Sequence, residues 1–536
     1  MAKIKHERPN FVKNYKKEKN TEIKHINGNW YLYERKTKYN PETKRSTKVS
    51  GKMLGKITEN GFVPKSIKAS TFREVEVKEY GASHYFMSNS QSILERLNEC
   101  FPNYGEQLYV IALMRIMYGK AFKRISINYE ASYISNMFPN LSLSPSTITQ
   151  LLKDVGRDRE SIKKFMDSYT KEKDRFILFD GHRILSSSNN LDMAEVGYDS
   201  KSRYSPQVNL IYMFSLNDRG SYPEYYKQYL GSVPDVSAFQ DIINETRIKE
   251  KDATIIADKG FGSIDNYNLI EDSGMNYIIP LRRGNLETKG IIPSNISEYK
   301  DAFIYHERNI HTSSIEKEDY NIHLYLDGSL YNAEIKDIIR RTEKKNNSIK
   351  IKRDRELKKR EQDNLFSGEK LEKRLYAKSR LSDEELASLV PIDISDVLKE
   401  RVSTGTITIK TNRKELNSRQ IYAIYKQRQA IEQFFKTYDN TLGYDSSYMR
   451  NDYSLEAWLF INHICMMMGM NAIEEISNIG EDKNISLDDL IITLRKIKAT
   501  KIRDKWYLSR FTNHVKILCE KLNIRFESQE IPSLNN

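Results

Sequence analysis

The feature that most constrains the fold is an alternation of short strand-like and helical segments that begins near residue 174. Runs rich in β-branched and aromatic residues predict four strands, at 175–180, 207–216, 254–257 and 276–280. Helices are expected between or after them, near 236–247 and 264–273. This order favours an α/β layer with some parallel strand pairing. The first and third of these runs end in or just before an aspartate, Asp180 or Asp258.

Carboxylates at strand ends are candidates for catalysis, because a strand is rigid and its last side chain projects into the cleft above the sheet. A strand-end aspartate is often only a turn former, so the interpretation depends on a third carboxylate. Tyr425, Arg428 and Glu432 share one side of a helix expected to begin near Ser418. Glutamate suits a cation and arginine suits a phosphate. Three such carboxylates are what a two-metal phosphodiester site needs.

Composition narrows the class of partner. The chain has 536 residues, a formal net charge of +13 and a pI of about 9.1, which favours several domains and a polyanionic partner such as DNA or RNA. The three cysteines are far apart, so disulfides and a cysteine zinc site are not expected. The apolar stretch Leu455–Ile473 contains polar residues and predicts a buried core helix. We therefore expect a cytoplasmic, nucleoid-associated protein with no membrane span.

Changes in periodicity predict six regions along the chain. They are a β-rich unit that is a candidate DNA contact (1–70), a helical region expected to bind DNA (71–172), a first core part (173–284), an insertion (285–402), a second core part (403–475) and a helical end that is a candidate for dimerisation (476–536). Ser144 begins a capped helix that is either a recognition helix or an ordinary amphipathic one. The charged tract from Ala333 to about Tyr376 fits a solvated helical hairpin as well as a DNA-contacting arm.

These motifs together resemble the DDE transposases of bacterial insertion sequences, in the group with a Tyr-x2-Arg-x3-Glu-x6-Lys signature. Tyr425, Arg428 and Glu432 match its first three positions. Asp180 matches the first aspartate, and the segment 255–261 around Asp258 matches the block of the second. The resemblance runs from about residue 174 to 475.

Three features depart from the group's pattern, and the first is Gln429, where an aromatic residue is expected just after the arginine. Asp439 stands where the signature has lysine, and Lys436, on the same helix, is a candidate substitute. The three tryptophans are Trp30, Trp458 and Trp506, so the 285–402 insertion has none. If a flipped base stacks on the insertion, a tyrosine or phenylalanine must take that role.

The resemblance implies a ribonuclease H-like core, a mixed sheet flanked by helices and split by the insertion. It implies that Asp180, Asp258 and Glu432 hold two Mg²⁺ ions, with Mn²⁺ as the other plausible metal. Tyr425, Arg428 and Lys436 would bind DNA phosphates. The implied reaction is cleavage at the ends of an element followed by strand transfer, carried out by a homodimer on double-stranded DNA (terminal inverted repeats and target). The alternatives are a non-catalytic DNA-binding protein derived from a transposase, or a nuclease without strand transfer.

Overall fold

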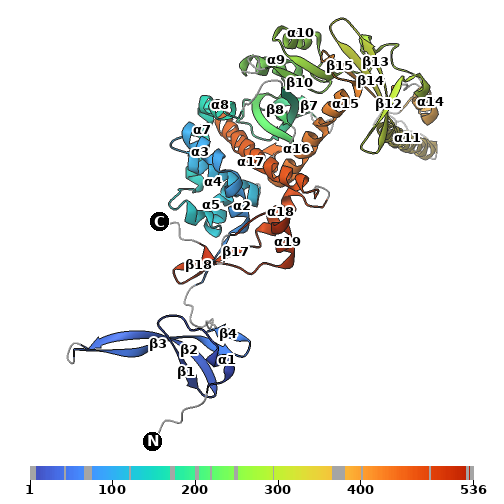
Figure 1. The fold of residues 1–536 in the computed structure, drawn as a ribbon. Helices are drawn as coiled ribbons and strands as arrows, with labels where there is room; N and C mark the ends of the chain where they lie inside the picture. Colours follow the sequence, from blue (N-terminus) through green and yellow to red (C-terminus); the bar gives the residue numbers. More distant parts are fainter. Residues whose placement is uncertain are drawn as a thin grey trace. The chain divides into compact units, whose positions relative to one another are not determined.

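The structure is a computed structural model that divides into two compact units. It describes residues 8–40, 44–65, 75–119, 122–169, 175–198, 204–217, 220–246, 252–293, 295–364, 381–399, 403–481, 484–526 and 530–531. The first unit comprises Met1–Val77, Thr500–Tyr507 and Glu530–Ser533, and the second contains most of the remaining chain (Figure 1). The far end of the charged tract predicted to reach Tyr376 lies outside the described residues.

The first unit contains a four-stranded antiparallel sheet. Its elements are α1 (Asn10–Lys13), β1 (Thr21–Ile26), β2 (Asn29–Asn40), β3 (Arg45–Thr58) and β4 (Gly61–Pro64), with the strands in chain order. Asn27 and Gly28 both have positive φ, at 47° and 76°, which is the backbone that a two-residue hairpin turn requires. Trp30, Leu32 and Ile57 form a small core with Val12. The strands predicted around Trp30 and Lys52 lie in β2 and β3.

Helices precede the main sheet, and several of them contact one long buried helix, α17 (Asp452–Asn478). They are α2 (Gly81–Asn89), α3 (Gln91–Cys100), α4 (Gly105–Tyr118), α5 (Ile125–Ala131), α6 (Ile134–Met137), α7 (Pro145–Arg157) and α8 (Arg159–Asp167). A Cβ at Gly156 would lie 1.8 Å from the Tyr453 carbonyl oxygen, so only glycine allows α7 to approach α17 this closely. Ser144 caps α7, and Ser146 and Thr149 stay exposed on it. Its role as a recognition helix remains a prediction.

The predicted core helix Leu455–Ile473 lies within α17 and is buried. Among the residues that the structure describes, no helix combines the length and the apolar content that crossing a membrane requires.

The main sheet contains eleven strands and is mixed, which is consistent with a ribonuclease H-like domain. Its central strands are β6 (Arg175–Ser186), β7 (Glu195–Tyr198), β8 (Tyr204–Asn217), β9 (Gly220–Leu230), β10 (Ala253–Ile256) and β11 (Asn276–Pro280). β8 pairs antiparallel with β6 and β9, whereas β10 pairs parallel with β6 and β11. The predicted helices are α9 (Asp235–Glu245) and α10 (Ile264–Asp272).

The strands of the predicted insertion are continuous with this sheet. They are β12 (Asp301–Tyr305), β13 (Arg308–Glu316) and β14 (Asn321–Asp327), and β14 pairs with β15 (Thr406–Thr411), which pairs with β11. The segment predicted to be an insertion therefore contributes strands to the main sheet instead of forming a sheet of its own. Its helices are α11 (Gly328–Asn364), α13 (Asp383–Ala387) and α14 (Ile394–Lys399).

The C-terminal region contains strands that the sequence analysis missed. The predicted helix behind Ser486 is α18 (Leu487–Leu494), with a capping box from Ser486 to Asp489, and α19 (Asn513–Lys521) follows later. The missed strands are β17 (Lys498–Ile502), β18 (Lys505–Leu508) and β19 (Glu530–Ile531), which share a sheet with β5 (Glu76–Glu79). These strands are short, with five, four and two residues, so none shows the sustained alternation that marks a half-buried strand.

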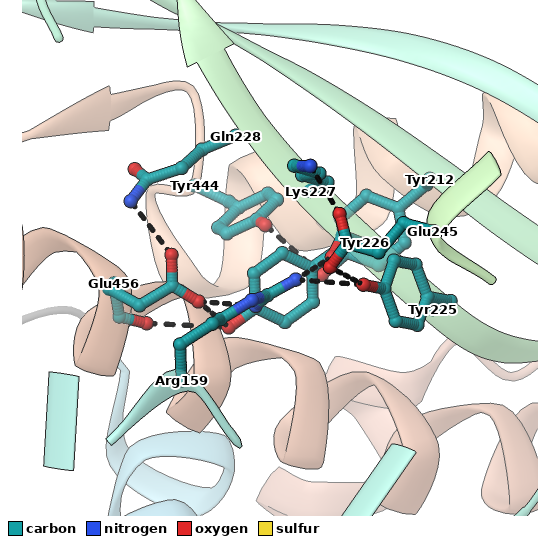
Figure 2. A network of polar contacts seen from close by, with 9 residues as sticks. All are labelled: Arg159, Tyr212, Tyr225, Tyr226, Lys227, Gln228, Glu245, Tyr444 and Glu456. Carbon is teal, nitrogen blue, oxygen red and sulfur yellow. Dashed lines mark hydrogen bonds and ion pairs between the residues drawn. The ribbon is translucent and has the colours of Figure 1, made fainter. Parts of the chain in front are cut away.

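A polar network around Arg159 and Glu456 joins α8, α17 and β9 inside the second unit (Figure 2). The Arg159 guanidinium lies 2.5 Å from the Glu456 carboxylate and donates to the Tyr226 carbonyl at 2.8 Å. The Tyr226 hydroxyl and the Gln228 amide also donate to Glu456, at 2.9 and 2.7 Å. One positive charge thus meets one negative charge, and donors saturate the carboxylate, which is how a buried ion pair is tolerated.

Candidate active site

The parallel register of β6 and β10 places Asp180 and Asp258 level with each other. Ile256, the last residue of β10, is opposite Leu178 of β6, and each aspartate follows two residues later. The sequence predicted that Asp180 ends its strand. In the structure the strand does not end there, because β6 continues to Ser186 through its pairing with β8. It lies where β10 stops, so its carboxylate still reaches the edge at which the second aspartate emerges.

Asp258 begins a tight turn after β10. The Phe261 amide donates to the Asp258 carbonyl at 2.9 Å, and the Lys259 amide donates to the Asp258 side chain at 2.6 Å. Arg282 donates to the Lys259 carbonyl at 3.2 Å. These bonds fix the turn, and 37% of the Asp258 side chain remains accessible to solvent.

The third carboxylate comes from a helix that is interrupted. The sequence predicted one helix from Ser418, whereas the structure has α15 (Ser418–Lys426) and α16 (Arg428–Leu442) on either side of Gln427. Arg428 is therefore the first residue of α16, and Glu432 follows one turn later. Gly443 ends α16 with a φ of 60°, the left-handed conformation that glycine readily adopts at a helix end.

Arg428 gathers all three carboxylates around one guanidinium. Nη2 lies 3.0 Å from Asp180 Oδ1 and 3.8 Å from Asp258 Oδ2. Nη1 lies 2.9 Å from Glu432 Oε1. The Arg428 and Asp180 side chains are buried, with 13% and 10% accessible, whereas 44% of Glu432 is exposed. The structure thus brings the predicted triad together from β6, the turn after β10 and α16.

The charges at this point are not balanced, since three carboxylates face one guanidinium. Burial raises the pKa of Asp180; Arg428 opposes the increase, and the charges of Glu432 and Asp258 add to it. Burial alone would lower the pKa of Arg428, but the carboxylates of Asp180 and Asp258 outweigh burial and raise it. Arg428 therefore stays charged, and the site attracts further cations.

The predicted phosphate-binding residues occupy different settings. Tyr425 contacts Arg428, and burial raises its pKa to about 12, so the hydroxyl remains a hydrogen-bond donor at neutral pH. Lys436 is exposed on α16 and takes part in none of the ion pairs found among the described residues. Asp439, at the position where lysine was expected, lies 3.4 Å from His182 Nε2.

Several residues of this region were not predicted from the sequence. The His182 ring stacks between Phe435 and Tyr444, with centroids 4.9 and 5.3 Å apart, and so joins β6 to α16. On the opposite face of β6, Arg183 donates to Asp235 at 2.7 Å, and Asn209 donates to the same oxygen at 2.9 Å. The period-2 alternation after Asp180 is the signal that separates these two faces.

The donor set at the triad fits a hard divalent cation. Carboxylates are the ligands that Mg²⁺ and Mn²⁺ prefer, and these three already converge on one positive charge. Within the described ranges no three or more His, Cys, Asp or Glu side chains form a ready-made metal cluster. The guanidinium takes the central position among the carboxylates instead.

A family model described as a transposase DDE domain matches residues 171–468, more than half of the chain. The matched range begins before β6 and ends within α17, so it includes all three triad carboxylates. No curated protein matches the chain.

Proposed function

Because the chain belongs to the transposase DDE domain family, a family of nucleic-acid-processing enzymes, we propose that it is a DNA transposase that cleaves the ends of its element and joins them to target DNA. The observation that carries this proposal is the convergence of Asp180, Asp258 and Glu432 on Arg428. A scaffold has no need to gather three carboxylates around one cation at a half-exposed edge.

Asp180, Asp258 and Glu432 would hold the two divalent cations, Mg²⁺ or Mn²⁺. When bound, the metals would supply an activated oxygen nucleophile and stabilise the leaving oxygen during in-line displacement. Asp180 is anchored in mid-strand, whereas Asp258 and Glu432 remain open to solvent, so substrate can approach from their side. A rigid first ligand and two accessible ones suit a site that must admit a DNA strand.

Arg428 and Tyr425 would hold a phosphate next to the scissile bond. The planar guanidinium matches phosphate oxygens with two parallel hydrogen bonds, and the protonated Tyr425 hydroxyl can donate a third. Lys436 would add a positive charge from the exposed side of α16. These residues orient the DNA backbone and stabilise the charge that develops on the phosphate.

The products of the reaction distinguish this proposal from its alternatives. Wild-type protein is incubated with Mg²⁺ and a plasmid carrying the DNA that flanks the coding region. We expect strand breaks at the element ends and joined products with a target plasmid. Breaks without joining would indicate a nuclease, and the absence of metal-dependent breaks would indicate a DNA-binding protein.

The protein would act on DNA as a homodimer, with one end of the element bound by each subunit. The net charge of +13 supports DNA binding, because lysine and arginine release counterions from phosphates. Analytical ultracentrifugation of the protein with terminal DNA tests the stoichiometry. A complex of one subunit with one duplex at saturation would contradict the dimer.

A further inference from the structure

One side of α11 carries a row of cations that its own neighbours do not neutralise. At about 100° per residue, Lys359, which pairs with Glu356, falls within the same arc of about 140° as five exposed basic residues that form no such pair among the described residues. These residues, which we call the basic stripe, are Lys344, Lys345, Lys352, Arg355 and Lys358. None of them takes part in an ion pair with the described residues, whereas Arg340 and Arg341, one turn earlier, pair with Asp337.

The exposed acidic residues in this part of α11 lie outside the arc of the stripe, and the buried Glu356 lies at its edge. Glu343, Asp354 and Glu361 are exposed and lie about 110–130° from its centre. Opposite charges three or four residues apart stabilise a solvated helix, and Asp354, Glu356 and Glu361 have this spacing from Lys352 or Lys358. None of the three forms an ion pair with the stripe among the described residues, and Glu356 pairs with Lys359. Lys352, Arg355 and Lys358 follow one another at three-residue spacing, an arrangement that repels. The repulsion calls for a partner that supplies negative charge.

A third face of α11 packs on the chain and fixes the helix. Thr342 and Glu356 are buried, and the Asn346 amide exchanges hydrogen bonds with the Ile392 backbone at 2.9 and 2.7 Å. Arg360 donates to the Leu381 carbonyl at 2.9 Å. Because these contacts use the face next to the stripe, the stripe itself is left uncovered by the described residues.

The surface along the stripe is hollowed. A cavity of about 500 Å³ is lined by Lys352 and Arg355 of the stripe, together with Ser348, Ile351, Glu356, Lys359 and Leu381. Ile351 is the large apolar side chain that the stripe exposes, at 52%. The lining has no aromatic side chain of the kind that anchors many protein–protein interfaces. Three of its residues carry a positive charge and only Glu356, which is buried, a negative one, so the hollow suits phosphate groups.

We propose that the basic stripe binds the phosphate backbone of double-stranded DNA. From Lys344 to Lys358 the helix rises about 21 Å, which spans about six base pairs of duplex. Lysine and arginine at this spacing can each reach a phosphate without reading sequence. The inference rests on the proposed function only in that transposition supplies duplex DNA as the partner.

The test compares salt dependence of DNA binding between matched variants of the full chain. Lys352→Gln/Lys358→Gln removes two stripe charges, and Lys350→Gln/Arg353→Gln removes two exposed charges of the same helix outside the stripe. Binding to a duplex of about 30 base pairs, or about three turns, is measured by fluorescence anisotropy at several salt concentrations. Circular dichroism checks that the helix content is unchanged.

We expect the slope of log K against log salt to fall by about 2 for the stripe variant. Its affinity should fall tenfold or more at about 0.15 M salt for every duplex sequence, and the control should retain the wild-type slope. Equal slopes for the stripe variant and the wild type, or an equal loss in the control, would overturn the inference. Cleavage is scored separately with wild-type protein, so an inactive wild type that still shows the stripe effect would count against the proposed function alone.

Discussion

Two arginines of this chain are surrounded by carboxylates in opposite ways. Arg159 faces a single carboxylate, Glu456, whose oxygens also accept hydrogen bonds from Tyr226 and Gln228 (Figure 2). Arg428 faces three carboxylates, and among the described residues their hydrogen bonds and ion pairs come from Arg428 itself and the Lys259 amide. The first group is neutral and saturated, whereas the second has an excess of negative charge.

The difference distinguishes a contact that stabilises the fold from one that we propose serves chemistry. A buried pair must be balanced, because an unpaired charge in the interior is costly. An excess of carboxylates is tolerated near the surface, where 44% of Glu432 and 37% of Asp258 are exposed. The excess lowers stability unless cations bind, which makes the site a candidate for metal binding.

The largest expected effect on stability comes from breaking the balanced pair. Glu456→Ala should lower the free energy of unfolding by about 3–5 kcal/mol, because it leaves the Arg159 charge without a partner. Glu432→Ala should change it by less than about 1 kcal/mol, because that carboxylate is half exposed. Urea denaturation without metal measures both, and similar losses would contradict the distinction.

Divalent cations should stabilise the protein through the carboxylates around Arg428 and not through Glu456, the partner of Arg159. Mg²⁺ at about 100 times its dissociation constant should stabilise the wild type by about 2.7 kcal/mol. Asp180→Asn should lose most of this gain, and Glu456→Gln should keep it. Thermal unfolding with Mg²⁺ or with EDTA gives the comparison, and an equal gain in both variants would show that the metal binds elsewhere.

Two tyrosines sharpen the contrast. Tyr226→Phe removes a buried donor to Glu456 and should lower stability by about 1 kcal/mol. Tyr425→Phe removes a hydroxyl beside Arg428 and should mainly weaken DNA binding. Urea denaturation and anisotropy are measured on both variants. Weaker DNA binding in Tyr226→Phe together with lower stability in Tyr425→Phe would contradict the roles assigned to the two regions.

The smallest effect is the pH dependence caused by Asp180, whose pKa is raised by burial. As pH rises above about 4, the ordinary range of aspartate, the unfolded chain ionises first, so folding loses stability until the folded carboxyl has also ionised. Asp180→Asn removes this loss. Its stability relative to the wild type should therefore increase from pH 4 to pH 7 in EDTA. A difference independent of pH would contradict the raised pKa.

Short sequence segments were enough to predict the central strands and to single out the three carboxylates. The four strands that the sequence predicted correspond to β6, β8, β10 and β11 because their residues are β-branched and continuously apolar. Asp180, Asp258 and Glu432 could be singled out because each lies in a recognisable local setting. The closeness of the three carboxylates could not be predicted, since it depends on the register that places Ile256 opposite Leu178.

Other features depend on contacts between distant segments, which no short window contains. Arg428 was expected to bind an anion, and its contact with three carboxylates follows from the break at Gln427 and the pairing of β6 with β10. The contact of Asp439 with His182 also joins two segments far apart in sequence. The pairing of β14 with β15, which makes the insertion part of the core sheet, is equally long-range.

The most direct test of the central claim measures Mg²⁺-dependent cleavage of the flanking DNA by single carboxylate variants. Asp180→Asn, Asp258→Asn and Glu432→Gln should each reduce the rate by roughly three orders of magnitude, a loss of about 4 kcal/mol, while DNA binding is retained. Asp265→Asn, which alters an exposed aspartate of α10, should cleave as the wild type does. Wild-type rates in all three triad variants would contradict the claim that these carboxylates form the active site.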